Sequence, residues 1–225
     1  MKNYWKKSIL FVLTPAIFFS CNHGSMKDGQ TLEEGTLLNN TTLTDEEKQT
    51  LLAEKYRECH FVEDKMELNV IKGSVPTLIP TPSEKWIYGY LDEINEDDSE
   101  NYKFIMAYDL EKDSLYFLVP PGSADYGESD ILRSRYKDYK LYKNHLYLIH
   151  ADLGHLYLPY IPYSIYYINV NNFLWYTVSE VESYGRETGF VGDKIKAQTY
   201  YISKESEEDS WENEYADSIQ WIEME

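Results

Sequence analysis

The sequence predicts a mainly β fold of antiparallel, blade-like sheets, propeller-like or packed as a sandwich, with one N-terminal helix. The chain has 22 tyrosines among 225 residues, and tyrosine favours strands because its apolar ring and polar hydroxyl suit a half-buried sheet face. From residue 60 onward, short apolar and aromatic runs alternate with polar turn segments, which is typical of antiparallel hairpins. One earlier segment, residues 44–59, has apolar residues at helical spacing.

Residues 1–20 have the three parts of a bacterial export signal. Lysines at positions 2, 6 and 7 make the start basic, residues 8–19 are almost wholly apolar, and the small Ser20 precedes Cys21. The apolar run is shorter than the roughly 20 residues that span a bilayer, and Pro15 interrupts it. We therefore interpret residues 1–20 as a cleaved signal peptide rather than as a transmembrane anchor.

The four residues Phe18-Phe19-Ser20-Cys21 resemble the lipobox of bacterial lipoproteins, in which a small residue precedes the cysteine. This resemblance implies that Cys21 becomes the lipidated first residue of the mature protein and holds it on a membrane. It places the protein in the envelope of a Gram-negative cell, on the periplasmic face or on the outer surface. An ordinary cleaved signal with an incidental Cys21 is the alternative.

Two segments separate the signal from the β region. Residues 21–43 are polar and have no apolar period, so we expect a flexible tether. Thr44 and Glu47 form a capping-box pattern, which predicts a helix from about Asp45 to Glu58. The partial apolar stripe of this helix indicates that it packs against a sheet.

Residues 60–225 are predicted to form a single β domain with about three weak repeats, spaced by roughly 50–60 residues. Residues 73–83 contain three prolines and are expected to form a loop or a broken edge segment. The expected strands are 66–71, 85–91, 103–110, 114–119, 139–142, 145–150, 164–170, 173–178, 194–203 and 218–224.

Two short polar pairs are expected to make hairpin turns. Lys143-Asn144 would turn the chain between the strands 139–142 and 145–150. Asn171-Asn172 would do the same further along. Because asparagine tolerates positive φ, as tight hairpin turns require, we expect the positive φ to fall on this Asn pair.

The second repeat has the order short strand, tight turn, strand, long loop and hairpin, which resembles a blade of a kelch-type or related β-propeller. The matching residues are Tyr108-Asp109-Leu110, Ile168-Asn169-Val170-Asn171 and the late aromatic Trp175. The resemblance implies propeller blades, but three repeats are fewer than the four or more blades of a closed ring. A twisted sheet or sandwich of the same hairpins is equally acceptable.

The formal net charge of −18 excludes nucleic acid as a favoured partner, because like charges repel. It favours a basic protein or a neutral ligand such as a glycan. The sequence lacks a nucleophile elbow, a zinc-protease motif, a phosphate-binding loop and a dinucleotide fingerprint, so we predict no enzyme activity and no cofactor. His150, Asp152 and His155 could converge across a turn, but ordinary turn-flanking histidines are the preferred interpretation, and no metal site is predicted.

Three loops occupy matching places in the repeats and are expected to share one rim. Residues 92–100 and 205–217 are acidic, whereas 156–163 is aromatic and proline-rich. Aromatic anchors surrounded by charge are typical of recognition surfaces. Solvated acidic loops and an aromatic loop packed into the core are the alternatives. The residues predicted to contact a partner are Tyr157, Tyr160, Tyr163, Asp97, Asp98, Glu207, Glu208 and Asp209.

These features together predict a membrane-tethered, non-enzymatic lipoprotein. Its expected ligand is an envelope or extracellular protein. For instance, this chain would act as an immunity protein that neutralises a cationic toxin. A glycan-binding surface lipoprotein is the first alternative, because tyrosine and tryptophan rings stack on sugars. An envelope hydrolase that uses two paired carboxylates is the second.

Overall fold

The computed structural model describes residues 43–58, 74–93, 102–121, 134–152, 162–178, 183–184, 187–204 and 214–225. These residues form one helix, α1, and the strands β1 to β12, which pair antiparallel within each unit. The predicted fold class, mainly β with antiparallel sheets and one N-terminal helix, is confirmed for the described residues. They divide into two compact units, residues 43–118 and residues 119–225.

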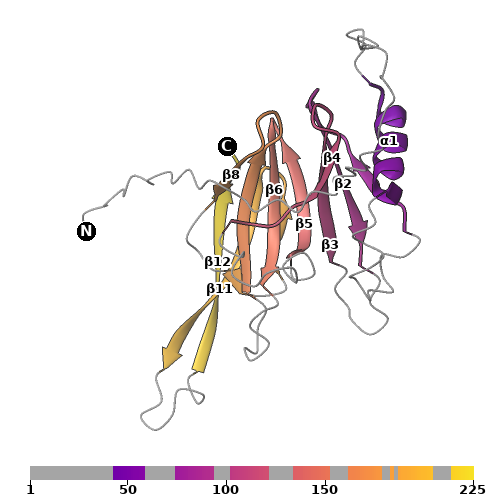
Figure 1. Ribbon diagram of the computed structural model, residues 1–225. Helices are drawn as coiled ribbons and strands as arrows, with labels where there is room; N and C mark the ends of the chain where they lie inside the picture. Colours follow the sequence, from indigo (N-terminus) through magenta and orange to yellow (C-terminus); the bar gives the residue numbers. More distant parts are fainter. Residues whose placement is uncertain are drawn as a thin grey trace, which may run out of the picture. The chain divides into compact units, whose positions relative to one another are not determined.

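In the first unit a helix packs on four consecutive strands, β1 to β4 (Figure 1). Each strand pairs antiparallel with the next one along the chain, so the sheet is a meander. Nearly all of the side chains of the two middle strands are buried. The elements are α1 (Asp45–Glu58), β1 (Thr77–Ile79), β2 (Trp86–Asp92), β3 (Lys103–Asp109) and β4 (Ser114–Phe117).

The start of α1 is fixed by a capping box, as the sequence predicts. The hydroxyl of Thr44 accepts a hydrogen bond from the main-chain N–H of Glu47 at 3.3 Å. The Glu47 carboxylate accepts in return from the main-chain N–H of Thr44 at 2.8 Å and from its hydroxyl at 2.9 Å. These bonds to Thr44 hold the pKa of Glu47 below its ordinary value. The predicted bounds of the helix, Asp45 and Glu58, are confirmed.

The helix approaches the sheet closely because Gly89 of β2 has no side chain. Leu52 of α1 is fully buried against this position. A Cβ atom built on Gly89 would lie 2.3 Å from Cδ2 of Leu52 and 2.8 Å from the carbonyl oxygen of Thr77. Glycine is therefore required where the helix, β1 and β2 meet.

The edge strand β1 lies in the proline-rich segment for which the sequence predicts a loop or an edge. Gln49 of α1 links the helix to this strand through its side-chain amide. Its Nε2 donates to the carbonyl of Pro76 at 2.7 Å, and its Oε1 accepts from the N–H of Leu78 at 2.7 Å. A side chain thus satisfies main-chain groups that an edge strand would otherwise leave to solvent.

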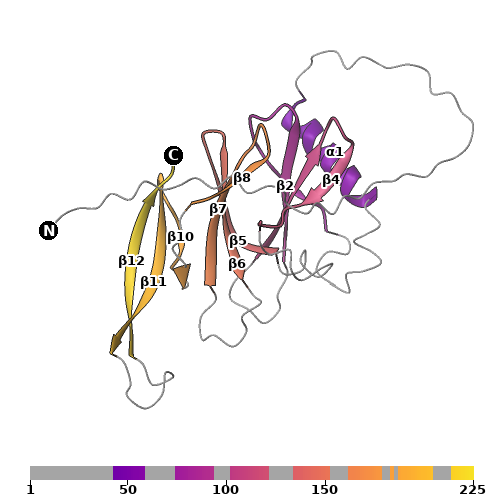
Figure 2. The ribbon, with the colours of Figure 1, turned by 60° about the vertical axis from the view of Figure 1, so that its left-hand side comes forward.

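The second unit contains two sheets (Figure 2). In the first, β5, β6, β7 and β8 form an antiparallel meander, and β9 also pairs with β7. In the second, the strand order is β10-β11-β12. The strands are β5 (Ser134–Tyr142), β6 (His145–Asp152), β7 (Pro162–Asn169), β8 (Leu174–Thr177), β9 (Ser183–Tyr184), β10 (Gly189–Val191), β11 (Lys194–Lys204) and β12 (Glu214–Glu223).

The two sheets of the second unit share an apolar core. Tyr147 and Ile165 of the first sheet pack with Ile195 and Ala197 of β11 and with Met224, and all five are at most 5% exposed. Tyr147 also binds the chain after β12. Its hydroxyl accepts from the main-chain N–H of Glu225 at 2.8 Å and lies 3.1 Å from the main-chain oxygen of that residue. The part of the β10-β11-β12 sheet around Ile195, Ala197 and Ile222 therefore has one interior face, whereas Ser218 and Gln220 further along β12 are exposed.

One backbone pattern occurs three times in the described part of the chain. In each copy a turn leads into a strand, and the next strand runs antiparallel to it. The residue that follows this second strand donates its main-chain N–H to a carbonyl oxygen of the turn, and we call this bond the closing hydrogen bond. We call β1–β4 copy 1, β5–β8 copy 2 and β10–β12 copy 3. The three closing hydrogen bonds are Leu110 N–H to Lys85 O at 3.0 Å, Val170 N–H to Asn144 O at 2.9 Å, and Met224 N–H to Asp193 O at 3.1 Å.

The β7–β8 loop of copy 2 differs from the sequence prediction in its length and in the position of its positive φ. Asn169 pairs with Leu174, so the loop has four residues rather than the two of an Asn171-Asn172 turn. The positive φ falls on its last residue, Phe173 (φ 59°), and on the equivalent Asp113 (φ 50°) of copy 1. The expectation that the Asn pair adopts positive φ is wrong. In this loop the main-chain N–H of Asn171 donates to Oδ1 of Asn169 at 3.0 Å, and Oδ1 of Asn172 accepts from the main-chain N–H of Leu174 at 3.1 Å.

Asp113 also joins the β3–β4 loop to the helix. Its Oδ1 lies 2.7 Å from the ammonium of Lys55 and accepts a hydrogen bond from the Tyr108 hydroxyl at 2.6 Å. The bond from Lys55 is the main reason that the pKa of Asp113 is lowered, and the bond from Tyr108 adds to it. The same contact raises the pKa of Lys55.

These shifts predict how acid affects the stability of the first unit. A lowered folded-state pKa means that the stabilisation by Asp113 is present above its ordinary pKa and disappears as the pH falls through the folded value. Because the Asp113 side chain is 67% exposed, solvent screening limits the gain to about 1 kcal/mol or less. Asp113→Asn removes the charge, and asparagine still tolerates the positive φ of this position. The variant should therefore have a lower free energy of unfolding than the unchanged chain at pH 7, but not at pH 2, where the aspartate is protonated as well. Urea titrations at both pH values measure this difference, and an equal loss at both would contradict the charge effect.

Candidate functional site

Most of the residues predicted to contact a partner lie outside the described residues. Tyr163 is described, and β7 places it in the interior, where it is 1% exposed. The ammonium of Lys137 lies 4.8 Å from the centre of its ring. The predicted lipidation site Cys21, the signal peptide, the tether and the strand at 66–71 are also outside the described part. So are the predicted contacts Tyr157, Tyr160, Asp97, Asp98, Glu207, Glu208 and Asp209.

A different surface stands out among the described residues. Four large apolar side chains are exposed, and three of them belong to the β10-β11-β12 sheet. Val191 of β10 is 52% exposed, Trp221 of β12 is 51% exposed and Ile219 of β12 is 39% exposed. The fourth, Val75, precedes β1 in the first unit. An exposed tryptophan with two apolar neighbours is more informative than scattered apolar residues, because tryptophan is enriched at binding hot spots.

The strand register places these three residues on one face. Val191 pairs with Lys194, and Trp221 pairs with Lys196. Side chains directly opposite each other in a sheet point to the same side, and neighbours along a strand alternate. The alternate residues, such as Ile195 and Ile222, point the other way, into the shared core. We call the set Val191, Lys194, Lys196, Ile219, Trp221 and Glu223 on the other side the outer face. Gln198, which lies opposite Ile219 on the same side, is buried.

Ion pairs surround the apolar part of the outer face. Lys194 contacts Glu223 across the strands at 2.7 Å, and Lys196 is bonded to the carboxylate of Glu187. The contact with Glu223 raises the pKa of Lys194, and the bond from Lys196 lowers the pKa of Glu187. The face thus has an apolar centre and a charged rim whose charges balance locally, which is the usual composition of a protein interface.

The repeat explains why an apolar residue occupies this exposed position. The place of Trp221 in copy 3 corresponds to that of Tyr167 in copy 2, because both lie two residues before the end of their strand pair. Tyr167 is packed against the core that copies 2 and 3 share. Its ring lies 5.1 Å from that of Tyr147 and stacks on that of Tyr176 at 4.8 Å. The face of copy 2 that carries Tyr167 is therefore covered by copy 3, whereas the equivalent face of copy 3, which carries Trp221, is exposed to solvent.

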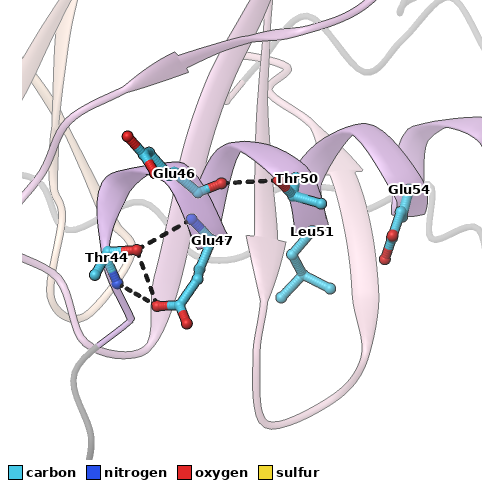
Figure 3. Close-up of a pocket in the computed structure, with 6 residues that line it drawn as sticks. All are labelled: Thr44, Glu46, Glu47, Thr50, Leu51 and Glu54. Atoms are coloured by element: carbon cyan, nitrogen blue, oxygen red, sulfur yellow. Dashed lines mark hydrogen bonds between the residues drawn. The ribbon is translucent and has the colours of Figure 1, made fainter.

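A hollow lies beside α1. It measures about 500 Å³ and is lined by Thr44, Glu46, Glu47, Thr50, Leu51 and Glu54. Figure 3 shows that the carboxylates of Glu46 and Glu47 point to opposite sides of the helix start. Glu47 is already bonded in the capping box.

The described residues contain no group of three or more His, Cys, Asp or Glu side chains that could hold a metal ion. His150 lies on β6 and is buried. His155, which could converge with His150 according to the sequence analysis, lies outside the described residues. No helix in the described segments is long and apolar enough to cross a membrane.

Comparison with known proteins gives little further information. No family model matches the chain, and no curated protein matches it. The chain is similar to the crystal structure of a "putative conserved lipoprotein" from Clostridium novyi NT, at 14% identity and a TM-score of 0.34, over 66% of this chain and 86% of that one. A likeness at this level defines neither the fold nor the function of this chain. The kelch-type resemblance has no support from these comparisons.

Proposed function

We propose that this chain is a membrane-tethered, non-enzymatic binding protein of the bacterial envelope that engages a protein partner through the outer face of the β10-β11-β12 sheet. The observation that carries the proposal is the exposure of Trp221, Ile219 and Val191 on one side of a sheet whose other side packs into the core through Ile195, Ala197 and Ile222. A monomeric surface rarely gathers large apolar side chains in this way unless something covers them.

The charges of the face favour binding over chemistry. Both lysines of the outer face are ion-paired with glutamates, so they act as a rim rather than as reactive groups. The surrounding chain is strongly acidic, with a formal charge of −18. Such a field accelerates encounter with a basic partner. A basic protein is therefore the proposed class of partner, and an immunity-type role is one form that this binding could take.

The membrane tether is proposed from the export signal and from Cys21. A lipid on Cys21 would hold the domain at a membrane. The comparisons do not support a Gram-negative cell in particular, so the proposal extends only to a bacterial envelope.

The proposal predicts that the outer face is needed to capture the partner. The unchanged chain should capture a partner protein from an envelope extract, and high salt should weaken this capture. The double variant Ile219→Ser, Trp221→Ser should capture at least tenfold less of the same protein. Loss of a well-packed tryptophan anchor has this scale of effect. Quantitative mass spectrometry of the captured proteins measures it at low and at high salt, because salt screens the attraction.

The matched control is Val75→Ser, which removes an exposed apolar side chain of the first unit. It should leave capture unchanged. Thermal unfolding of all variants checks that they fold. If the double variant and Val75→Ser captured the same proteins to the same extent, the outer face would not be the binding surface.

A further inference from the structure

Copies 1 and 2 each end with a fourth strand, β4 and β8 respectively. The described residues of copy 3 form three strands, β10, β11 and β12. In copy 1, residues 106–109 of β3 pair with 114–117 of β4. In copy 2, residues 166–169 of β7 pair with 174–177 of β8. Both fourth strands continue the pairing with one more hydrogen bond, from Leu118 N–H to Ile105 O at 2.9 Å and from Val178 N–H to Ile165 O at 3.0 Å.

The strand β12 holds the place of β3 and β7. The equivalence follows from the closing hydrogen bonds, which align Glu223 with Asp109 and Asn169. Residues 220–223 therefore correspond to the segments that receive β4 and β8. In the described part of the chain, β12 is the last strand of its sheet and pairs with β11 alone.

The outer edge of β12 can be assigned residue by residue. The N–H of Met224 points to the turn before β11, so alternate residues such as Ile222 point to β11 as well. The main-chain groups of Trp221 and Glu223 then point away from β11. An edge with free N–H and C=O groups is a template for another strand.

We propose that an extended segment of the partner adds to this edge as a fourth, antiparallel strand, in the way that β4 and β8 complete copies 1 and 2. This inference rests on the proposed function, because it specifies how the partner engages the same surface. Strand addition supplies affinity through main-chain hydrogen bonds and specificity through alternate side chains.

The fold itself indicates which residue the added strand should carry opposite Trp221. In copy 1 the corresponding pair is Ala107 and Tyr116, and in copy 2 it is Tyr167 and Tyr176. The two rings of copy 2 stack with an interplanar angle of 16°. An aromatic side chain on the added strand would stack on the exposed ring of Trp221 in the same way.

Charge indicates a basic segment of another protein rather than a second copy of this chain. Two copies would bring together molecules of formal charge −18 each, and such self-repulsion opposes association. The exposed Glu225 lies just after the end of β12. The occupant is therefore an extended, cationic segment with an aromatic residue at its centre.

The test uses the full chain in detergent and a fluorescent peptide that carries the β8 sequence Leu-Trp-Tyr-Thr between lysines. The peptide should bind, and hydrogen exchange of the segment around 220–223 should slow at least tenfold when it does. Glu223→Pro removes the outward N–H of the edge and should weaken the peptide at least tenfold relative to Glu223→Ala. Both variants lose the ion pair with Lys194, so their difference isolates the main-chain donor.

Absence of peptide binding, or binding without slower exchange at 220–223, would overturn strand addition. Equal affinities for Glu223→Pro and Glu223→Ala would also overturn it. The proposed function is judged separately by the capture experiment. If Trp221 were needed for capture while the edge stayed unprotected, the partner would bind the outer face without adding a strand.

Discussion

Replacing Gly89 with alanine is expected to lower the free energy of unfolding by about 2–3 kcal/mol, because overpacking a well-filled core costs this much. The new Cβ would lie 2.3 Å from Cδ2 of Leu52 and 2.8 Å from the carbonyl oxygen of Thr77. The leucine can rotate only within a packed interior. The carbonyl belongs to the edge strand that pairs with β2, so it cannot move without disturbing that pairing.

Gly189→Ala is the matched control for this substitution. Gly189 also lies in a strand, but a Cβ built there meets no atom within 4 Å. The change should stay within about 0.5 kcal/mol, as for most surface substitutions. Urea unfolding followed by circular dichroism gives both values. Equal midpoints for the two variants would show that α1 does not pack on β2 as described.

A double variant separates the two clashes at Gly89. Leu52→Ala removes the atom that lies 2.3 Å from the new Cβ but leaves the carbonyl of Thr77 in place. We therefore expect Gly89→Ala to cost less in the Leu52→Ala background than in the unchanged chain, but still to cost something. Such coupling is typical of residues in direct contact.

Replacing Cys21 with serine is expected to release the protein from the membrane or to leave its signal uncleaved. The prediction follows from the lipobox-like residues before Cys21. Stable anchoring needs two or more acyl chains, because a single chain binds only marginally. Cell fractionation together with intact mass of the membrane fraction measures both the location and the lipid.

The control for this experiment is Cys59→Ser, which replaces the second of the two cysteines. It should remain in the membrane fraction with the lipid attached. If the unchanged protein were soluble and began at a residue other than an acylated Cys21, the lipoprotein interpretation would be refuted.

The local parts of this fold could be predicted from the sequence because local interactions determine them. The capping box of Thr44 and Glu47 fixed the start of the helix correctly. The hairpins followed from alternating apolar runs. The loop geometry was missed, although Asp109 carried a signal: its carboxylate accepts from the N–H groups of Glu111 and Lys112 inside the loop.

The outer face could not be predicted because it depends on which sheets pack together. The segment Ser-Ile-Gln-Trp-Ile-Glu-Met at 218–224 has apolar residues in both alternating phases, with Ile219 and Trp221 in one and Ile222 and Met224 in the other. This pattern predicts a strand but does not indicate which of its two phases is buried. Only the packing of β11 and β12 against Tyr147 and Ile165 decides which phase is interior.

The partner-binding residues chosen from the sequence were selected by charge and aromatic content. Except for the buried Tyr163, they lie outside the described residues, and their role stays a prediction. A sequence shows where charges cluster along the chain, but exposure of an apolar side chain such as Trp221 is a property of the assembled sheets.

The binding role is tested most directly by photocrosslinking in living cells. A benzophenone amino acid in place of Trp221 should form a crosslink to one defined protein, because the outer face would be covered in the envelope. The same amino acid in place of Val75, which is 55% exposed in the first unit, should give no such product. A crosslink at 221 to a single partner is the predicted result. No crosslink at 221, or the same products at 221 and 75, would contradict it.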